Sequence, residues 1–98
     1  MREKQFYVYI MASRPNGAIY IGVTSDLPQR YHQHCQGMVE GHTKKYHIKT
    51  LVYYEAHENA ESAIIREKQL KKWTRAMKND LIAKANPLWE DLGNRIAY

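Results

Sequence analysis

Two short segments near the start of the chain, residues 6–11 and 18–23, predict a pair of β-strands. Both are rich in aromatic and branched residues, and their side chains alternate as strand residues do. Pro15, Asn16 and Gly17 lie between them and provide turn chemistry, because asparagine and glycine both tolerate a positive φ. The chain is therefore expected to begin with an antiparallel hairpin.

Alternation divides the side chains of this hairpin between two faces. The apolar face carries Phe6, Val8, Ile10, Ile19, Ile21 and Val23. The opposite face carries Tyr7, Tyr9 and Tyr20 beside Gly22. A glycine at such a position leaves room for another group to approach the backbone, so this phenol face is a candidate functional surface.

The remaining segments predict three helices and one further strand. Asp26 is a predicted N-cap with Pro28 in the first turn after it, and Asn86-Pro87 ends the last helix, because proline cannot continue the helical ladder. The helices are expected over residues 27–36, 58–72 and 73–85, the strand over 50–55, and a loop over 37–46. Trp89, Leu92 and Ile96 suggest a tail that packs back onto the domain.

Length and charge narrow the class of protein. A chain of 98 residues predicts a single domain over residues 1–98 with one modest core. Its 15 lysines and arginines exceed its 10 aspartates and glutamates, and this balance favours polyanionic partners, nucleic acid first. The alternative is a merely basic surface. With one cysteine, no signal peptide and no membrane span, the expected location is the cytoplasm.

Glu67 is the most informative single residue of the later helices. The apolar positions that recur at helical spacing around it are Ala60, Ala63, Ile64 and Leu70. A carboxylate inside such a stripe must be ion-paired, hydrogen-bonded or bound to a metal. Two interpretations follow for Glu67: a buried salt bridge to Arg30 or a lysine, or a metal site.

Arg30 and His34 are four residues apart on the first predicted helix and therefore share one face. That face turns a cation and an imidazole toward the sheet. In the alternative, the Arg30 side chain extends to solvent and His34 is an ordinary core histidine.

The phenols, Arg30 and Glu67 together match the needs of phosphodiester hydrolysis, which are a base, positive charge on the phosphorane and help for the leaving oxygen. Tyrosine accepts a proton only if its pKa falls, which adjacent cations can cause. The fork of Arg30 matches phosphate oxygens. A single carboxylate, Glu67, suits one hard divalent cation that keeps several waters.

Further cations form a candidate nucleic-acid-binding set. Its members are Lys44, Lys45, Lys71, Lys72, Arg75 and Lys78. Their excess over nearby acidic residues suits a phosphate backbone, and the alternative is a solvated helix surface.

These motifs together resemble the GIY-YIG nuclease family, in particular its small standalone bacterial members. The residues that carry the resemblance are Tyr7-Val8-Tyr9, Tyr20-Ile21-Gly22, Arg30 with His34, Arg66-Glu67-Lys68, and Asn86-Pro87-Leu88-Trp89. The likeness extends from Phe6 to about Leu92 and includes the catalytic domain of the bacterial excision-repair incision subunit. It implies an α/β (α+β) fold with a small three-stranded antiparallel sheet flanked by helices.

The resemblance also implies roles for residues. Tyr9 and Tyr20 would be the two motif tyrosines, one of them the general base or the group that positions water. Arg30 would steady the scissile phosphate, and His34 would tune or relay protons to a tyrosine. Glu67 would hold the metal, Mg²⁺ or Mn²⁺, near the leaving oxygen.

Two departures from the family pattern stand out. Tyr7 occupies the place where the first motif has glycine. The family also has a late asparagine near its site, and both Asn79 and Asn86 have suitable spacing, so that choice stays open.

The implied function is a metal-dependent DNA endonuclease, in repair or recombination, with specificity supplied by DNA structure or by a protein partner. The first alternative is a catalytically silent nucleic-acid-binding module of the same fold. The second is a protein-interaction domain that uses exposed Trp73 and Trp89.

Overall fold

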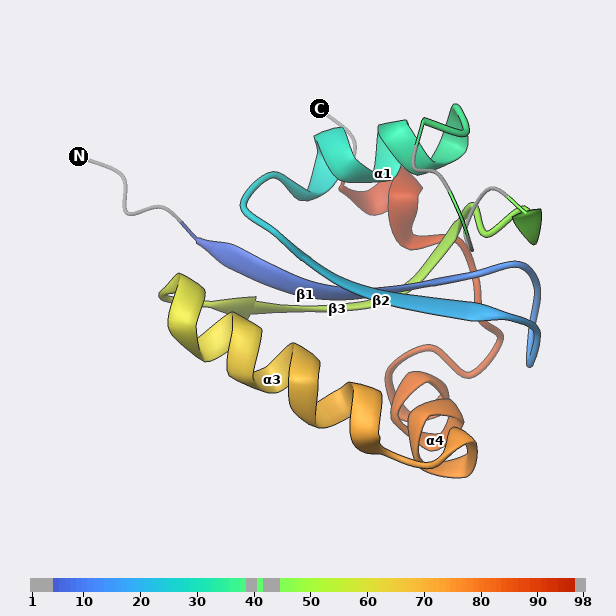
Figure 1. Ribbon diagram of the computed structural model, residues 1–98. Coiled ribbons are helices and arrows are strands. Elements are labelled where there is room, and N and C mark those ends of the chain that lie inside the picture. The colour runs from blue at the N-terminus through green and yellow to red at the C-terminus, as the bar shows by residue number, and fades with distance from the viewer. Residues whose placement is uncertain (1–4, 39–40, 42–44, 97–98) are drawn as a thin grey trace.

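The computed structural model describes residues 5–38, 41 and 45–96 (Figure 1). Of the predicted basic set, Lys44 lies outside the described residues. The strands are β1 (Phe6–Ala12), β2 (Ile19–Thr24) and β3 (Thr50–His57). The helices are α1 (Leu27–Cys35), α3 (Ala60–Lys72), α4 (Arg75–Ala85) and the short 3₁₀ helix η1 (Leu92–Arg95).

The three strands form one antiparallel sheet in the order β2-β1-β3, with β1 at its centre. Tyr9 of β1 lies opposite Gly22 of β2 on one side and Tyr54 of β3 on the other. The predicted fold class, an α+β domain with a three-stranded antiparallel sheet, is confirmed. Strand β3 is two residues longer than the sequence predicted and ends at His57.

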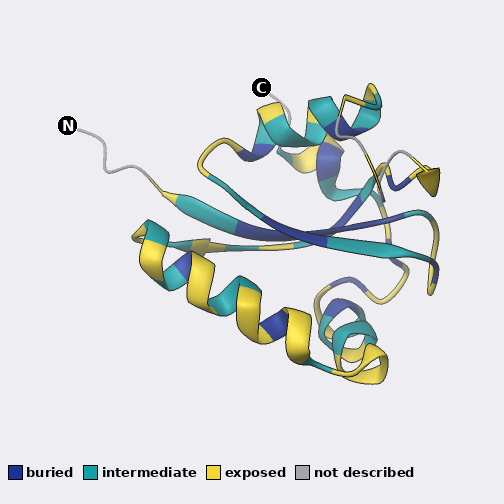
Figure 2. Cartoon of the chain, viewed as in Figure 1, coloured by how far each residue is buried: buried dark blue, intermediate teal, exposed yellow. Residues whose placement is uncertain are grey.

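Helices cover both faces of the sheet, so the molecule has three layers (Figure 1). Helix α1 and the C-terminal η1 lie on one face, and α3 and α4 lie on the other. Buried residues concentrate along the middle of the strands, as Figure 2 shows. Val8, Ile10 and Ile21 face α3 and α4, whereas Tyr9 and Met11 face α1 and the tail.

Side-chain caps set where the helices begin. Asp26 accepts a hydrogen bond from the Gln29 amide (3.1 Å) and starts α1 as predicted. Asn59 caps α3 through the Ser62 amide (2.8 Å), so this helix begins at Ala60 rather than at residue 58. The chain turns at Trp73, and Thr74 caps α4.

The inward stripe of α3 is narrower than the sequence predicted. Ala63 and Leu70, two turns apart, are fully buried against the sheet, but Ile64 is 43% exposed. When only residues two turns apart contact the sheet, the helix positions beside them lie at the edge of the contact and are partly exposed. The prediction that Ile64 and Glu67 both sit inside the stripe is therefore wrong for Ile64, and Glu67 lies at its margin with 19% of its side chain exposed.

A polar network fastens α3 to β3. The Glu55 carboxylate accepts hydrogen bonds from Tyr53 Oη (2.6 Å), His57 Nε2 (2.7 Å) and Arg66 Nε (3.0 Å). Burial alone would raise the pKa of Glu55, but these hydrogen bonds outweigh it and hold the pKa below its usual value. Because Arg66 directly precedes Glu67, this network also fixes how α3 is rotated about its axis, and so the direction in which the Glu67 side chain leaves the helix.

The tail packs back onto the domain, as predicted. The Asp91 carboxylate accepts hydrogen bonds from Tyr31 Oη (2.5 Å) and the Leu51 amide (3.1 Å). Gly93 lies directly under the Tyr31 ring, which leaves no room for a side chain there. Within the described part of the chain, no helix combines the length and the apolar character that a membrane crossing requires.

Candidate active site

The Tyr9 ring crosses the neighbouring strand at Gly22. A Cβ atom on Gly22 would lie 2.6 Å from the Tyr9 hydroxyl oxygen and 2.7 Å from the ring carbon that carries it. Since β2 is an edge strand, the ring carries a hydroxyl from the central strand toward the rim of the sheet. The Tyr9 side chain therefore fills the space that this glycine leaves.

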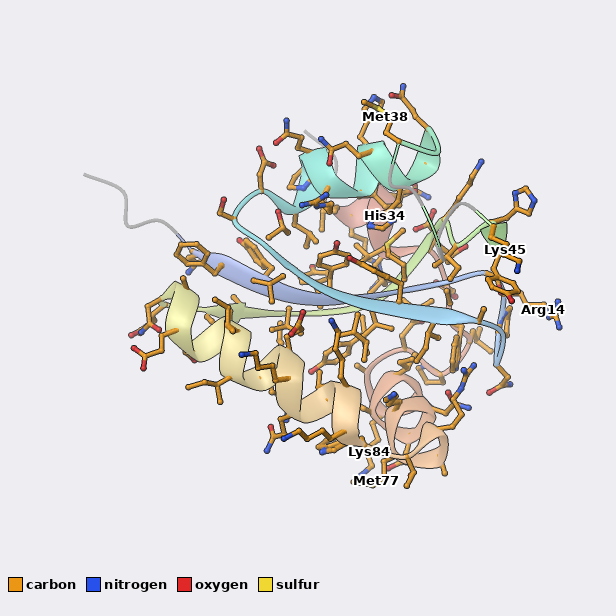
Figure 3. All side chains as sticks on the ribbon, in the orientation of Figure 1. Arg14, His34, Met38, Lys45, Met77 and Lys84 are labelled. Carbon is orange, nitrogen blue, oxygen red and sulfur yellow. The ribbon has the colours of Figure 1, made fainter. Side chains whose placement is uncertain are left out.

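Tyr9, Tyr20 and His34 form one cluster between α1 and the sheet. Tyr9 Oη is 3.2 Å from His34 Nε2. The ring centroids of Tyr9 and His34 are 5.7 Å apart, those of Tyr20 and His34 are 5.3 Å apart, and those of the two tyrosines are 6.1 Å apart. Figure 3 shows His34 pointing from α1 toward the sheet.

His34 is buried and electrically neutral at pH 7. Burial is the larger cause and the nearby Arg30 charge the smaller one, and together they lower its pKa to about 4. Its Nδ1 atom is buried with no hydrogen-bond partner in the part of the chain that the structure describes. His34 thus lies against both tyrosines, and Arg30 is near enough for its charge to act on His34.

Tyr9 is a neutral phenol with 1% of its surface exposed. Burial raises its pKa above the usual value, and so do the neighbouring Tyr20 and the charge of Glu67. Arg30 acts in the opposite direction, as expected of a cation, but burial outweighs it. Both Arg30 and Glu67 are therefore within electrostatic reach of the Tyr9 hydroxyl.

Glu67 lies on α3, which covers the other face of the sheet, and its charge acts on the Tyr9 hydroxyl. Its Oε2 atom is 3.0 Å from the Lys71 ammonium, one turn further along the helix. Of the two salt-bridge partners that the sequence offered, the structure shows a lysine rather than Arg30. The spacing of four residues was available as a signal for Lys71, because such pairs face each other on a helix.

A hollow of about 240 Å³ opens beside this cluster at the β2 edge. Its lining residues are Ile19, Tyr20, Ile21, Lys71 and Lys78. Tyr20, which is partly exposed, thus faces a space lined by two lysine side chains. Such a hollow has the charge and the openness to receive a phosphate.

Other predicted site residues lie apart from the cluster or serve the fold. Asn86 is buried and binds backbone groups of Val52 and Glu90, on the β3 side of the sheet. Asn79 lies next to Lys78 on α4 and accepts a hydrogen bond from Arg75 Nε (3.0 Å).

The remaining cations of the basic set occupy three different places. Arg75 donates to the Gly17 carbonyl in the hairpin turn. Lys72 is exposed at the end of α3. The Lys45 ammonium lies 5.5 Å from the Tyr46 ring centroid, away from the tyrosine cluster (Figure 3).

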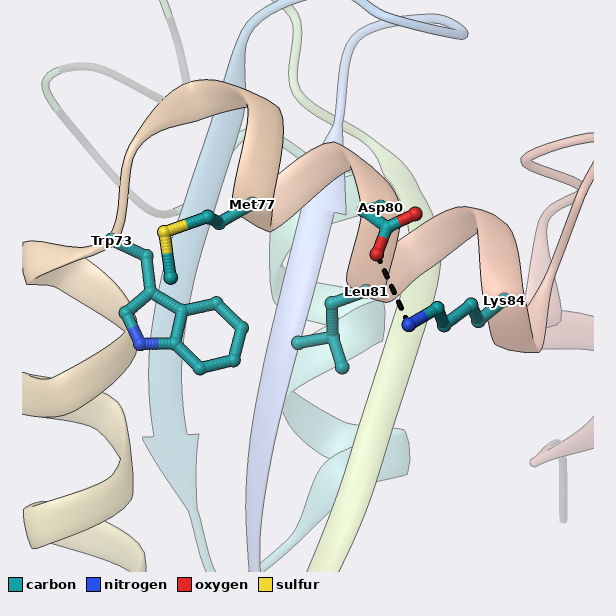
Figure 4. A pocket seen from close by; sticks show the side chains of 5 residues that line it. All are labelled: Trp73, Met77, Asp80, Leu81 and Lys84. Atoms are coloured by element: carbon teal, nitrogen blue, oxygen red, sulfur yellow. Dashed lines mark ion pairs between the residues drawn. The ribbon is translucent and has the colours of Figure 1, made fainter.

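A second hollow, of about 220 Å³, lies along α4 (Figure 4). Trp73, Met77 and Leu81 line it, and its one carboxylate, Asp80, is paired with Lys84 at 3.2 Å. It contains none of the predicted catalytic groups. Trp89, which the protein-interaction alternative needed exposed, is 6% exposed.

Glu67 offers carboxylate oxygens, the ligand type that hard divalent cations prefer. Among the described residues, no group of three or more His, Cys, Asp or Glu side chains could hold a metal ion. Mg²⁺ is commonly bound through one or two carboxylates and keeps several waters. The single, partly exposed Glu67 carboxylate beside Lys71 is compatible with such an ion.

Comparison with known proteins agrees with this geometry. The family model described as the GIY-YIG catalytic domain matches residues 5–80. A UPF0213 protein of Limosilactobacillus reuteri is 30% identical over 84 residues, covering 84% of this chain and 86% of that protein. A UPF0213 protein of Staphylococcus aureus is 34% identical over 76 residues, covering 78% and 92%.

A solved structure shows the same fold. The solution NMR structure of a UPF0213 protein from Bacillus halodurans matches with a TM-score of 0.56 and 26% identity, covering 96% of this chain and 99% of that one. With the family model matching most of its length and a relative 34% identical over 78% of it, the chain belongs to the GIY-YIG family.

Proposed function

We propose that this protein is a metal-dependent endonuclease that hydrolyses phosphodiester bonds in DNA, in the service of repair or recombination. One observation carries the proposal. The Tyr9 ring packs over Gly22, and its hydroxyl lies within hydrogen-bond distance of His34. The charges of Arg30 and Glu67 both act on this hydroxyl. Membership of the GIY-YIG family and the net charge of +5 support it.

The two tyrosines differ in solvent exposure, and we assign them different roles on that basis. A group that activates water must be within hydrogen-bond reach of it. Tyr20 is partly exposed and lines the hollow, so it is the phenol that contacts the attacking water. Tyr9 is buried behind it, and its hydrogen bond to the neutral His34 offers an imidazole nitrogen as the final proton acceptor.

Each charged group has a different role in binding the phosphates. Arg30 binds two oxygens of the scissile phosphate, since its planar fork matches them, and stabilises the charge that develops there. A bound phosphate also raises the pKa of His34, which makes the imidazole a better proton acceptor during the reaction. Glu67 would hold magnesium or manganese, which would supply positive charge for the leaving oxygen. Lys71 and Lys78 bind flanking phosphates in the hollow.

The test is cleavage of branched, nicked and plain duplex DNA by the purified protein with Mg²⁺ or Mn²⁺. We expect Glu67→Gln and Tyr20→Phe to lower the rate at least about 100-fold, the usual cost of losing one transition-state group. Glu61→Gln is the matched control, because Glu61 is an exposed carboxylate of the same helix. We expect it to cleave at the wild-type rate.

Two results would overturn the proposal. One is equal cleavage by wild type and Glu67→Gln. The other is salt-sensitive DNA binding without strand scission in either metal, with Glu67→Gln binding as well as wild type. The second result would instead identify a silent nucleic-acid-binding module of this fold.

A further inference from the structure

The Glu67 carboxylate already has a cation beside it. The Lys71 ammonium lies 3.0 Å from Glu67 Oε2, where the proposed function requires a metal ion. Glu67 is 19% exposed and Lys71 is 53% exposed. Ion pairs of this spacing stabilise a helix little, and the lysine end of this pair is largely in water, so its ammonium can leave the carboxylate.

Lys71 also borders the hollow that holds Tyr20. Lys78 lines the same space from α4, and the other lining groups are apolar apart from the phenol. A lysine ammonium is a compact charge on a flexible stem and can turn between nearby anions. From one backbone position, Lys71 can therefore reach either the carboxylate of its own helix or an anion in the hollow.

We propose that Lys71 exchanges between these two anions and thereby couples metal binding to nucleic-acid binding. A divalent ion at Glu67 repels the ammonium and displaces it. The released Lys71 then binds a phosphate of the nucleic acid in the hollow, next to Lys78. This inference rests on the proposed function, because it takes Glu67 as the metal ligand and nucleic acid as the partner.

The exchange has a reciprocal consequence. If metal binding strengthens nucleic-acid binding by some factor, nucleic acid must strengthen metal binding by the same factor. Without substrate, Lys71 competes with the metal, and a bound phosphate removes the competitor. The protein would therefore hold its metal most tightly when a strand lies in the hollow.

The test compares Lys71→Met with Lys68→Met. Methionine keeps most of the aliphatic stem and removes the charge. Lys68 is the matched control, because it is exposed and lies one residue from Glu67, on a different side of the helix. Mg²⁺ is titrated into each protein without DNA, and its affinity is read from amide chemical shifts in NMR spectra.

We expect Lys71→Met to bind Mg²⁺ about three- to tenfold more tightly than wild type, from the loss of a neighbouring positive charge. Lys68→Met should change the affinity less than about twofold, since its charge points to solvent. Equal affinities in wild type and Lys71→Met, or equal gains in both variants, would overturn the exchange.

A second measurement follows the coupling. Binding of a fluorescent 20-base-pair duplex is measured by anisotropy with and without Ca²⁺ at constant ionic strength, with the DNA checked for integrity. Wild type should bind more tightly with Ca²⁺, whereas Lys71→Met should bind more weakly and gain less from the ion. A Ca²⁺ effect that is unchanged in Lys71→Met also counts against the inference.

Glu67→Gln separates the two proposals. Glu67-dependent Mg²⁺ binding that Lys71→Met leaves unaltered removes the exchange alone and leaves the nuclease proposal standing. Mg²⁺ binding that is identical in wild type and Glu67→Gln removes the metal site itself, and both proposals with it.

Discussion

The hydroxyl of Tyr9 occupies the space that the missing side chain of Gly22 leaves on the neighbouring strand. The two residues are direct partners in the sheet, and a Cβ atom at Gly22 would lie within 2.6 Å of the phenol oxygen. This contact explains why a tyrosine on the central strand and a glycine on the edge strand occur together. Because Gly22 has no side chain, the Tyr9 ring can lie across β2 and place its hydroxyl in the site.

Gly22→Ala should disable the site and weaken the fold. The Tyr9 ring is buried and cannot turn away freely, so the added methyl group overpacks the core at a cost of about 1–3 kcal/mol. A displacement of the hydroxyl by about 1 Å should lower cleavage about 100-fold. Urea denaturation and DNA cleavage measure the two effects.

A double-mutant cycle tests the cause. If the clash with Tyr9 is responsible, Tyr9→Leu should destabilise the Gly22→Ala protein by about 1 kcal/mol less than it destabilises wild type, because the shorter side chain relieves the contact. Strictly additive effects would show that Gly22 matters for another reason.

Local sequence signals predicted much of this fold. The hairpin followed from alternation and turn residues, and the start of α1 followed from Asp26. Those signals act within a few residues, where side-chain chemistry and backbone preference are sufficient. The shared face of Tyr9 and Tyr20 followed from the same period of two.

Contacts between residues far apart in the sequence determine the position of the tail and the environment of Tyr9, which local sequence signals did not predict. The covering of the phenol face by η1 depends on Asp91, which binds Tyr31 from sixty residues away. Burial in the cluster on this face raises the pKa of Tyr9, whereas the sequence suggested that cations would lower it. Neither alternation nor helical spacing carries information on such contacts.

His34 should make the stability of the protein depend on pH. Its pKa is about 4 in the folded chain against an ordinary 6.5, so the unfolded chain takes up a proton first as the pH falls. The free energy of unfolding should therefore decrease between pH 6.5 and pH 4, by at most about 3 kcal/mol from this group.

His34→Gln should flatten this dependence, since glutamine does not titrate. His32→Gln is the matched control, because His32 is exposed on the same helix. Urea denaturation between pH 4 and pH 7.5 gives the slopes. Identical slopes in wild type and His34→Gln would contradict the assignment.

Arg30→Ala should change both the titration of His34 and the rate of cleavage. The Arg30 charge lowers the pKa of His34, so its removal should raise that pKa, which NMR titration of the imidazole protons can follow. Cleavage should fall about 100- to 1000-fold with the loss of a phosphate-binding donor.

Arg30→Lys should retain the low pKa of His34 but recover only part of the activity, because lysine lacks the planar fork. Arg14→Ala, an exposed arginine in the hairpin turn, is the control and should alter neither quantity. Full activity in Arg30→Lys would reduce Arg30 to a source of charge.

The two candidate asparagines should separate by stability and activity. Asn86 is buried, donates to the carbonyl oxygens of Val52 and Glu90, and accepts from the Glu90 amide, so Asn86→Ala should lower the free energy of unfolding by about 2–3 kcal/mol. Asn79 accepts one exposed hydrogen bond, from Arg75, and directly follows Lys78, which lines the hollow. Asn79→Ala should therefore leave the melting temperature within about 2 °C of wild type.

Cleavage is expected to follow the opposite order. At a temperature where both variants are folded, Asn86→Ala should cleave DNA near the wild-type rate, whereas Asn79→Ala should lose about tenfold or more, the equivalent of one modest transition-state contact. The reason is position, since Asn86 is held against β3 and the hollow opens at β2, on the far side of the central strand. A folded but inactive Asn86→Ala protein beside a fully active Asn79→Ala protein would reverse the assignment and require a site that reaches across the whole sheet.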